Sequence, residues 1–238
     1  MFWIDPYYLL LVLPAIILSI WASARVNSTF KRYADQYARS GLTGADAARR
    51  ILDRNGLRYV RVMQTQGHLT DHYNPKDQTI YLSQSVYSSC SCSAIGVAAH
   101  EAGHAVQHAE NYVPIKIRSA IIPATNFGAK LSMPLILFGI LLSYWVPDRP
   151  EMILLAYAGV LLFSLTALFQ LVTLPTEYNA SARALKALDA SGTLTREELM
   201  KAKKVLSAAA LTYVAALLVS LMQLLRLLLM VSRNDRRR

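Results

Sequence analysis

The chain has few charged residues and very few cysteines for its length. Charged residues make up 17% of its 238 positions, whereas they make up about a quarter of a typical soluble protein. Its two cysteines, Cys90 and Cys92, lie so close together that a disulfide between them would be strained and would crosslink almost nothing. Without a second cysteine pair, a cysteine-based zinc site is also disfavoured. We interpret both as small residues leading into a helix, and nothing requires an oxidising compartment.

The excess of basic residues does not indicate nucleic-acid binding. The formal net charge is +10, but the lysines and arginines flank long apolar runs and form no stripe interleaved with exposed aromatics. This distribution is typical of the signals that orient a protein in a membrane. We therefore expect a lipid bilayer, and no nucleic acid, among the partners of the chain.

Long apolar runs predict membrane-spanning helices. Residues 7–24 carry no charge, and no basic segment precedes them, so an uncleaved transmembrane helix explains them better than a signal peptide does. Residues 131–146 and 152–174 are joined by a short polar turn and predict a transmembrane hairpin. Residues 205–231 form a further apolar run, interrupted only by Arg226.

The last run leaves two topologies open. The polar segment after residue 24 is rich in arginine, so the positive-inside rule puts it in the cytoplasm and the N-terminus outside. If residues 209–231 cross the bilayer, the arginine-rich tail lies outside, against the rule. If only the first part is in the membrane and Arg226 reaches the interface, the tail stays inside. We favour four spans.

These runs predict a mainly α, multi-pass membrane protein with polar segments on its cytoplasmic side. The expected division is an N-terminal transmembrane helix in residues 1–24, a cytoplasmic domain in 25–130, a transmembrane hairpin in 131–174, cytoplasmic helices in 175–204, and a C-terminal transmembrane helix with a basic tail in 205–238.

The first polar segment predicts a capped helix followed by strands. Thr43 can cap a helix whose third position is Asp46, and Asn55 with Gly56 would end it. Alternating apolar residues in 57–63 and 79–82 then predict two strands. We expect a small β-sheet or a hairpin here.

Two further helical regions follow in the polar segments. One helix begins near Ser91 or Ser93 and ends near Asn111. Residues 177–204 predict two short helices, broken at Ser191 and Gly192.

The pattern H-E-x-x-H at His100, Glu101 and His104 predicts a metal site on the first of these helices. Two imidazoles four positions apart lie on one helix face and can hold one zinc ion, Zn2+. Glu101 lies about 100° round the helix, so its carboxylate can reach a water molecule at the metal without ligating the metal itself. A pattern of five residues also arises by chance in long helices, so a site requires further ligands.

A catalytic zinc site needs at least one more protein ligand. His108 lies one turn beyond His104, but histidines at three successive turns are too widely spaced to meet one ion, so we interpret His108 as an ordinary polar residue. Glu177 is the better candidate, because it stands where the third span returns to the cytoplasmic surface. Its spacing alone leaves open that it only interacts with a helix dipole.

Five segments carry a resemblance to a known family. HEAGH followed far downstream by EYNAS resembles the gluzincin membrane proteases of the HtpX and CAAX-prenyl-protease type. The segments SGLTGADAARRILDRNGL, DHYNP, AAHEAGHAVQ, LVTLPTEYNASARAL and AAALTYVA resemble, in the same order, the YugP-type zinc-dependent membrane metallopeptidases. Five segments in register over nearly the whole chain form a specific pattern.

The resemblance implies a zincin-like α+β metalloprotease domain in which His100, His104 and Glu177 ligate zinc and Glu101 is the catalytic acid and base. Ser181 stands where the broader gluzincin pattern has an aspartate that braces a ligating imidazole. A serine hydroxyl can accept the same N–H, but without charge, so we expect weaker support for the metal.

The implied function is a zinc-dependent integral membrane endopeptidase that hydrolyses peptide bonds near the cytoplasmic membrane surface. Glu101 would act as general base on a water molecule activated by zinc. Polar residues near the matched segments could stabilise the oxyanion, and we prefer His72 because the strand beside it could pair with an extended substrate. The other candidates are Tyr178, Asn179, Arg183 and Tyr213.

Other functions and partners stay open. The protein could be a non-catalytic, zinc-stabilised membrane scaffold, although a structural zinc site needs four protein ligands and the sequence offers three. Transport is unsupported, because the spans carry almost no ionisable residue besides Arg226. We expect a polypeptide substrate that could be a membrane protein, a regulatory membrane partner or a homo-oligomer, and a bacterial-type inner membrane with the active site on the cytoplasmic side.

Overall fold

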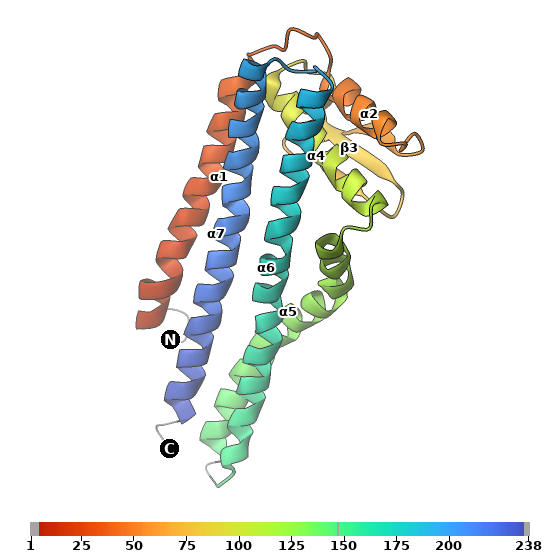
Figure 1. Ribbon diagram of the computed structural model, residues 1–238. Coiled ribbons are helices and arrows are strands. Elements are labelled where there is room, and N and C mark those ends of the chain that lie inside the picture. The colour runs from red at the N-terminus through yellow and green to blue at the C-terminus, as the bar shows by residue number, and fades with distance from the viewer. Residues whose placement is uncertain (1–4, 147, 236–238) are drawn as a thin grey trace. The chain divides into compact units, whose positions relative to one another are not determined.

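The computed structural model describes residues 5–146 and 148–235 (Figure 1). Contacts divide these residues into two compact units. The apolar unit consists of the described residues among 1–21, 117–174 and 213–238, and the polar unit consists of residues 22–116 and 175–212.

Within the described residues, four helices are long and apolar enough to cross a membrane: Tyr8–Ala34, Val113–Trp145, Ile153–Ala190 and Arg196–Asp235. The first comprises a π-helical turn, η1 (Tyr8–Val12), and α1 (Leu13–Ala34), and the other three are α5, α6 and α7. A short 3-10 turn, η2 (Pro150–Met152), precedes α6. By length and composition, these helices agree with the expected mainly helical, multi-pass architecture.

The long helices do not end where their apolar runs end. Helix α5 begins at Val113, α6 continues to Ala190, and α7 begins at Arg196. The two short helices predicted within 177–204 are therefore wrong as separate elements, because each is continuous with an apolar helix. The predicted break at Gly192 is confirmed: this glycine has a φ of +63°, in the left-handed region that favours glycine.

Arg226 forms a buried ion pair in the apolar unit. Its Nη2 lies 2.6 Å from Oδ2 of Asp5, and its guanidinium carbon lies 5.0 Å from the ring centroid of Tyr8. Only 5% of Arg226 is exposed. The side chain therefore has a charged partner inside this unit, so Arg226 by itself does not require the last span to end before it.

We expect Asp5→Ala to destabilise the protein by about 3–5 kcal/mol, because it leaves a buried guanidinium without its carboxylate. Thermal unfolding of the purified protein in detergent measures this. Removing both charges, in Asp5→Ala with Arg226→Leu, should be less harmful than Asp5→Ala alone. A double variant that unfolds earlier than the single variant would contradict this account.

The polar unit contains a small mixed sheet with strand order β1-β3-β2. The strands are β1 (Arg61–Thr65), β2 (His72–Asn74) and β3 (Thr79–Ser83). Strand β1 runs parallel to β3, and β2 runs antiparallel to it. The sequence predicted either a small sheet or a hairpin, and the sheet is correct. The two predicted strands correspond to β1 and β3, which are parallel neighbours and therefore cannot form a hairpin.

Helices α2 (Gly44–Arg54), α3 (Gln84–Tyr87) and α4 (Cys92–Ala109) complete the polar unit with the adjoining parts of α1, α6 and α7. Thr43 and Asp46 form the predicted capping box at the start of α2. Ser91 is the residue that caps α4, since its side chain accepts the N–H of Ala94. Nearly all of α4 is buried, so this helix is the centre of the unit.

Helices α4 and α6 approach each other closely at Gly103. A Cβ placed on Gly103 would lie 2.6 Å from the carbonyl oxygen of Ala180, well inside van der Waals contact. The backbone of α6 therefore lies directly against α4. Only glycine permits this spacing without a shift of one helix.

We expect Gly103→Ala to lower the free energy of unfolding by about 1–3 kcal/mol, because the added methyl group must push α6 away. Gly96→Ala in the same helix is the matched control: its Cβ would lie 3.2 Å from the Cβ of Ala202. There, the gain in helix propensity, about 1 kcal/mol, offsets the tighter contact. Thermal unfolding checks both variants, and equal shifts would argue against the close approach at Gly103.

Candidate metal centre

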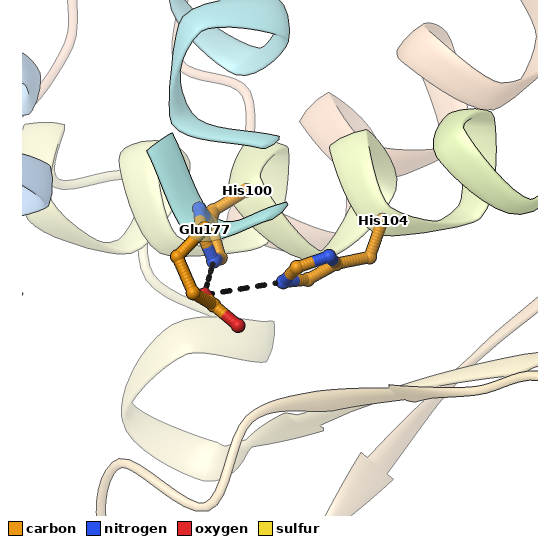
Figure 2. A group of neighbouring side chains, drawn as sticks. All are labelled: His100, His104 and Glu177. Atoms are coloured by element: carbon orange, nitrogen blue, oxygen red, sulfur yellow. Dashed lines mark hydrogen bonds and ion pairs between the residues drawn. The ribbon is translucent and has the colours of Figure 1, made fainter. Parts of the chain in front are cut away.

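Three metal-ligating side chains converge between α4 and α6. His100 and His104 project from successive turns of α4, and Glu177 projects from α6 (Figure 2). Oε2 of Glu177 lies 3.2 Å from Nε2 of His100 and 3.4 Å from Nε2 of His104. The three ligand atoms all lie within 4.8 Å of one another. A single cation could therefore contact all three.

The second nitrogen of each imidazole has a polar partner. Nδ1 of His100 lies 3.1 Å from Oγ of Ser181, and Nδ1 of His104 lies 3.0 Å from Oε1 of Gln107. Partners of this kind hold a ligating imidazole in one orientation. Both partners are uncharged, so neither ligand is braced by a carboxylate through this nitrogen.

The amide of Gln107 defines the tautomer of His104. Its Nε2 donates to the backbone oxygen of Thr176 at 2.8 Å and to Oδ1 of Asn179 at 3.0 Å. Because both partners are acceptors, the amide NH2 must face them, and Oε1 must face His104. An amide oxygen only accepts, so Nδ1 of His104 carries a hydrogen, and Nε2 is left as the atom directed at the candidate site.

The same network extends away from the ligands. Nε of Arg183 donates to Oδ1 of Asn179 at 2.7 Å, and Nη1 of Arg183 lies 2.6 Å from Oε2 of Glu110. Asn179 and Arg183, both considered for the oxyanion, are thus engaged in supporting Gln107.

Glu101 is buried on α4 with 7% of its surface exposed. A second carboxyl group, Asp71, interacts electrostatically with it. Asp71 accepts hydrogen bonds from the backbone N–H of Ser83 at 2.7 Å and from its hydroxyl group. Burial raises the pKa of Asp71 and the charge of Glu101 raises it further, whereas the Ser83 hydrogen bonds lower it.

The other candidate residues lie outside this group. His72 is exposed on β2, with its ring stacked 5.1 Å from that of Tyr81 and its Nδ1 2.8 Å from the backbone oxygen of Thr70. The ring of His108 lies 5.5 Å from that of Tyr73. Tyr178 is half exposed, and Tyr213 is grouped with the apolar unit. Both cysteines are free thiols and take no part in the group.

The donor set fits zinc. Two imidazole nitrogens and one carboxylate oxygen are the protein ligands of many catalytic zinc sites, in which a fourth position is left for water or substrate. The buried amide of Gln107 and the half-buried hydroxyl group of Ser181, which contact the imidazoles, are the further feature that such sites share. Among the described residues, His100, His104 and Glu177 form the one group of three or more His, Cys, Asp or Glu side chains that could hold a metal ion.

Sequence reasoning missed Gln107 and Asp71. Gln107 lies three positions after His104 on α4, so it shares a helix face with that histidine, and this spacing could have identified it. Asp71 stands beside His72 in the DHYNP segment, but no local pattern relates it to Glu101. That proximity arises from the packing of the sheet against α4.

The chain matches known proteins over nearly its full length. The family described as "Putative neutral zinc metallopeptidase" matches residues 8–232. "Putative membrane protease YugP" of Bacillus subtilis (strain 168) is 47% identical over 219 residues, which cover 92% of this chain and 94% of that protein. No solved structure matches the chain.

These two matches confirm the resemblance to the YugP-type zinc metallopeptidases. Zinc is the metal that the family indicates, and the structure offers a group of side chains that could bind it. The chain therefore belongs to the "Putative neutral zinc metallopeptidase" family.

Proposed function

We propose that this protein is a zinc-dependent membrane endopeptidase in which His100, His104 and Glu177 hold the metal and Glu101 is the general base. The observation that carries the proposal is the convergence of the three ligand atoms within 4.8 Å of one another, beside a buried carboxyl group on the same helix. The family description and the name of the Bacillus subtilis relative support peptide-bond hydrolysis as the reaction.

Zinc bound to these residues would lower the pKa of a water molecule and polarise the carbonyl group of the scissile peptide. Glu101 follows His100 directly on α4, which places its carboxylate beside the ligands without making it one of them. Glu101 would take the proton of the attacking water and pass it to the leaving amine.

Strand β2 would bind the substrate. It is an edge strand of the sheet and contacts α4, so an extended polypeptide could add to its open edge through backbone hydrogen bonds. His72 is exposed on this strand. We retain it as the candidate for stabilising the oxyanion, since Asn179 and Arg183 are engaged with Gln107.

Hydrolysis would take place at the cytoplasmic surface of a bacterial-type cell membrane. Arginine-rich polar sequence follows the first apolar helix, and the positive-inside rule places such sequence in the cytoplasm. Glu177 is the first charged residue after the uncharged run 152–176, so the site would lie near the level where this helix leaves the bilayer. Polypeptides in or near the membrane are the substrates we expect.

Glu101→Gln should lower the rate of hydrolysis of an unfolded polypeptide by about 100-fold to 10,000-fold, because a neutral amide cannot accept the proton of the water. The assay uses the full chain purified in detergent with zinc, with zinc content measured in parallel. Equal cleavage by the variant and the wild type would disprove the peptidase mechanism. Retained zinc without cleavage by either would instead favour the non-catalytic scaffold.

Glu177→Ala should abolish stoichiometric zinc binding, because it removes one of three ligands from a buried site. Ser181→Ala and Gln107→Ala should each weaken zinc binding by about 10-fold to 100-fold, since they release a ligating imidazole. Gln107→Ala should have the larger effect, because Gln107 is fully buried and joins α4 to α6. Competition with a fluorescent chelator measures these affinities.

The matched control for Glu177 is Glu197→Ala, which removes an exposed carboxylate paired with Lys201 and should bind zinc like the wild type. Unchanged zinc content in Glu177→Ala would remove Glu177 from the ligand set.

A further inference from the structure

A basic cavity of about 680 Å³ lies in the polar unit, and its lining includes Tyr178 but none of the three candidate metal ligands. It is lined by parts of α1, α6 and α7. Its polar lining consists of four basic side chains and four hydroxyl groups, from Arg25, Thr29, Arg32, Tyr33, Tyr178, Lys203, Lys204 and Ser207. In the part of the chain that the structure describes, no acidic side chain lines it. A cavity with this lining favours an anion.

The cavity lies where two of these helices change from polar to apolar sequence. Arg25 is the first charged residue after the uncharged run 6–24 of the first helix. Lys204 is the last charged residue before the uncharged run 205–225 of α7. In a chain whose apolar runs cross a bilayer, such positions lie at the level of the lipid headgroups.

The lysines of the cavity are available to a ligand. Lys203 and Lys204 are exposed, and neither ammonium group makes a hydrogen bond or ion pair within the part of the chain that the structure describes. Arg32 lies with its guanidinium carbon 5.8 Å from the ring centroid of Tyr33. The lining also includes the apolar side chains of Ala208 and Leu211, one and two turns further along α7 in the direction of its apolar run.

We propose that this cavity binds the phosphate group of an anionic phospholipid. A phosphodiester offers negative charge and several acceptor oxygens to the ammonium and guanidinium groups. The apolar residues beyond the lysines suit the glycerol backbone and the first part of the acyl chains. Basic residues next to a membrane span are attracted to anionic lipid in this way. A free phosphate ion shares the charged group but lacks the apolar part.

The test uses the full chain, purified in detergent and incubated with an equimolar mixture of phosphatidylglycerol and phosphatidylcholine. Native mass spectrometry counts the lipids retained on the protein. We expect the wild type to retain phosphatidylglycerol preferentially. The double variant Lys203→Gln with Lys204→Gln should lose roughly 30-fold of the affinity for phosphatidylglycerol, at about fivefold for each lysine.

The matched control is Arg50→Gln with Arg58→Gln, which removes the same amount of charge from exposed residues that do not line the cavity. This control should retain phosphatidylglycerol like the wild type. A second variant, Ser207→Asp, places a negative charge in the cavity and should reduce retention without removing any lysine. Retained zinc content shows that each variant is folded.

Three results would overturn the proposal. Equal losses of phosphatidylglycerol in the two double variants would show that the net charge of the protein attracts the lipid and that the cavity is not a specific site. Equal retention of both lipids by the wild type would exclude recognition of anionic lipid. If inorganic phosphate binds the wild type and not the lysine variant, while phosphatidylglycerol is not enriched, the cavity is a site for free phosphate. None of these measurements depends on peptidase activity.

Discussion

The close approach of α4 and α6 is the constraint on which the candidate site depends. Gly103 permits this approach, because its missing Cβ leaves room for the carbonyl oxygen of Ala180. As a result, Glu177 comes within 3.2 Å of His100 although the two residues are 77 positions apart. Gly103 itself lies between the two histidines of H-E-x-x-H. The same turn of helix therefore supplies both histidines and the packing that brings the third candidate ligand to them.

The hydrogen bonds around the site depend on the same contact. Gln107 on α4 reaches the backbone of Thr176 and the side chain of Asn179, which are both on α6. Such a buried amide is stable only when its donors and its acceptor are all satisfied. Since satisfying them requires both helices, the orientation of His104 is coupled to the distance between α4 and α6. A displacement of either helix would therefore disturb the geometry of the candidate site even with His100, His104 and Glu177 all in place.

Local patterns in the sequence predicted the helices around the site well, because their signals are local. The capping box of Thr43 and Asp46, the cap at Ser91, and the histidine pair of H-E-x-x-H each involve residues only a few positions apart. Glu177 was a candidate ligand from its place in the chain, but only the family resemblance connected it to the histidines as a member of the same site. No spacing rule relates residues on two helices that are joined by a long apolar hairpin.

The errors have a common physical origin. Hydropathy marks where the surroundings of a helix change from lipid to water, and it does not mark where the hydrogen-bonded helix ends. For this reason α6 was expected to end with its apolar run, whereas it continues to Ala190. The pairing of Arg226 with Asp5, 221 positions away, was missed for a related reason: an isolated charge in an apolar run indicates that a partner is needed, but not which residue provides it.

The continuity of α6 has a consequence for where the proposed peptidase could act. Glu177 directly follows the uncharged run 152–176 in the same helix, and α6 continues through this junction although Pro175 lies inside it and cannot donate a backbone hydrogen bond. Because α6 continues through this junction, no loop separates the residue Glu177 from the apolar run. Under the proposed function, this continuity favours substrates whose peptide bonds lie close to the membrane surface.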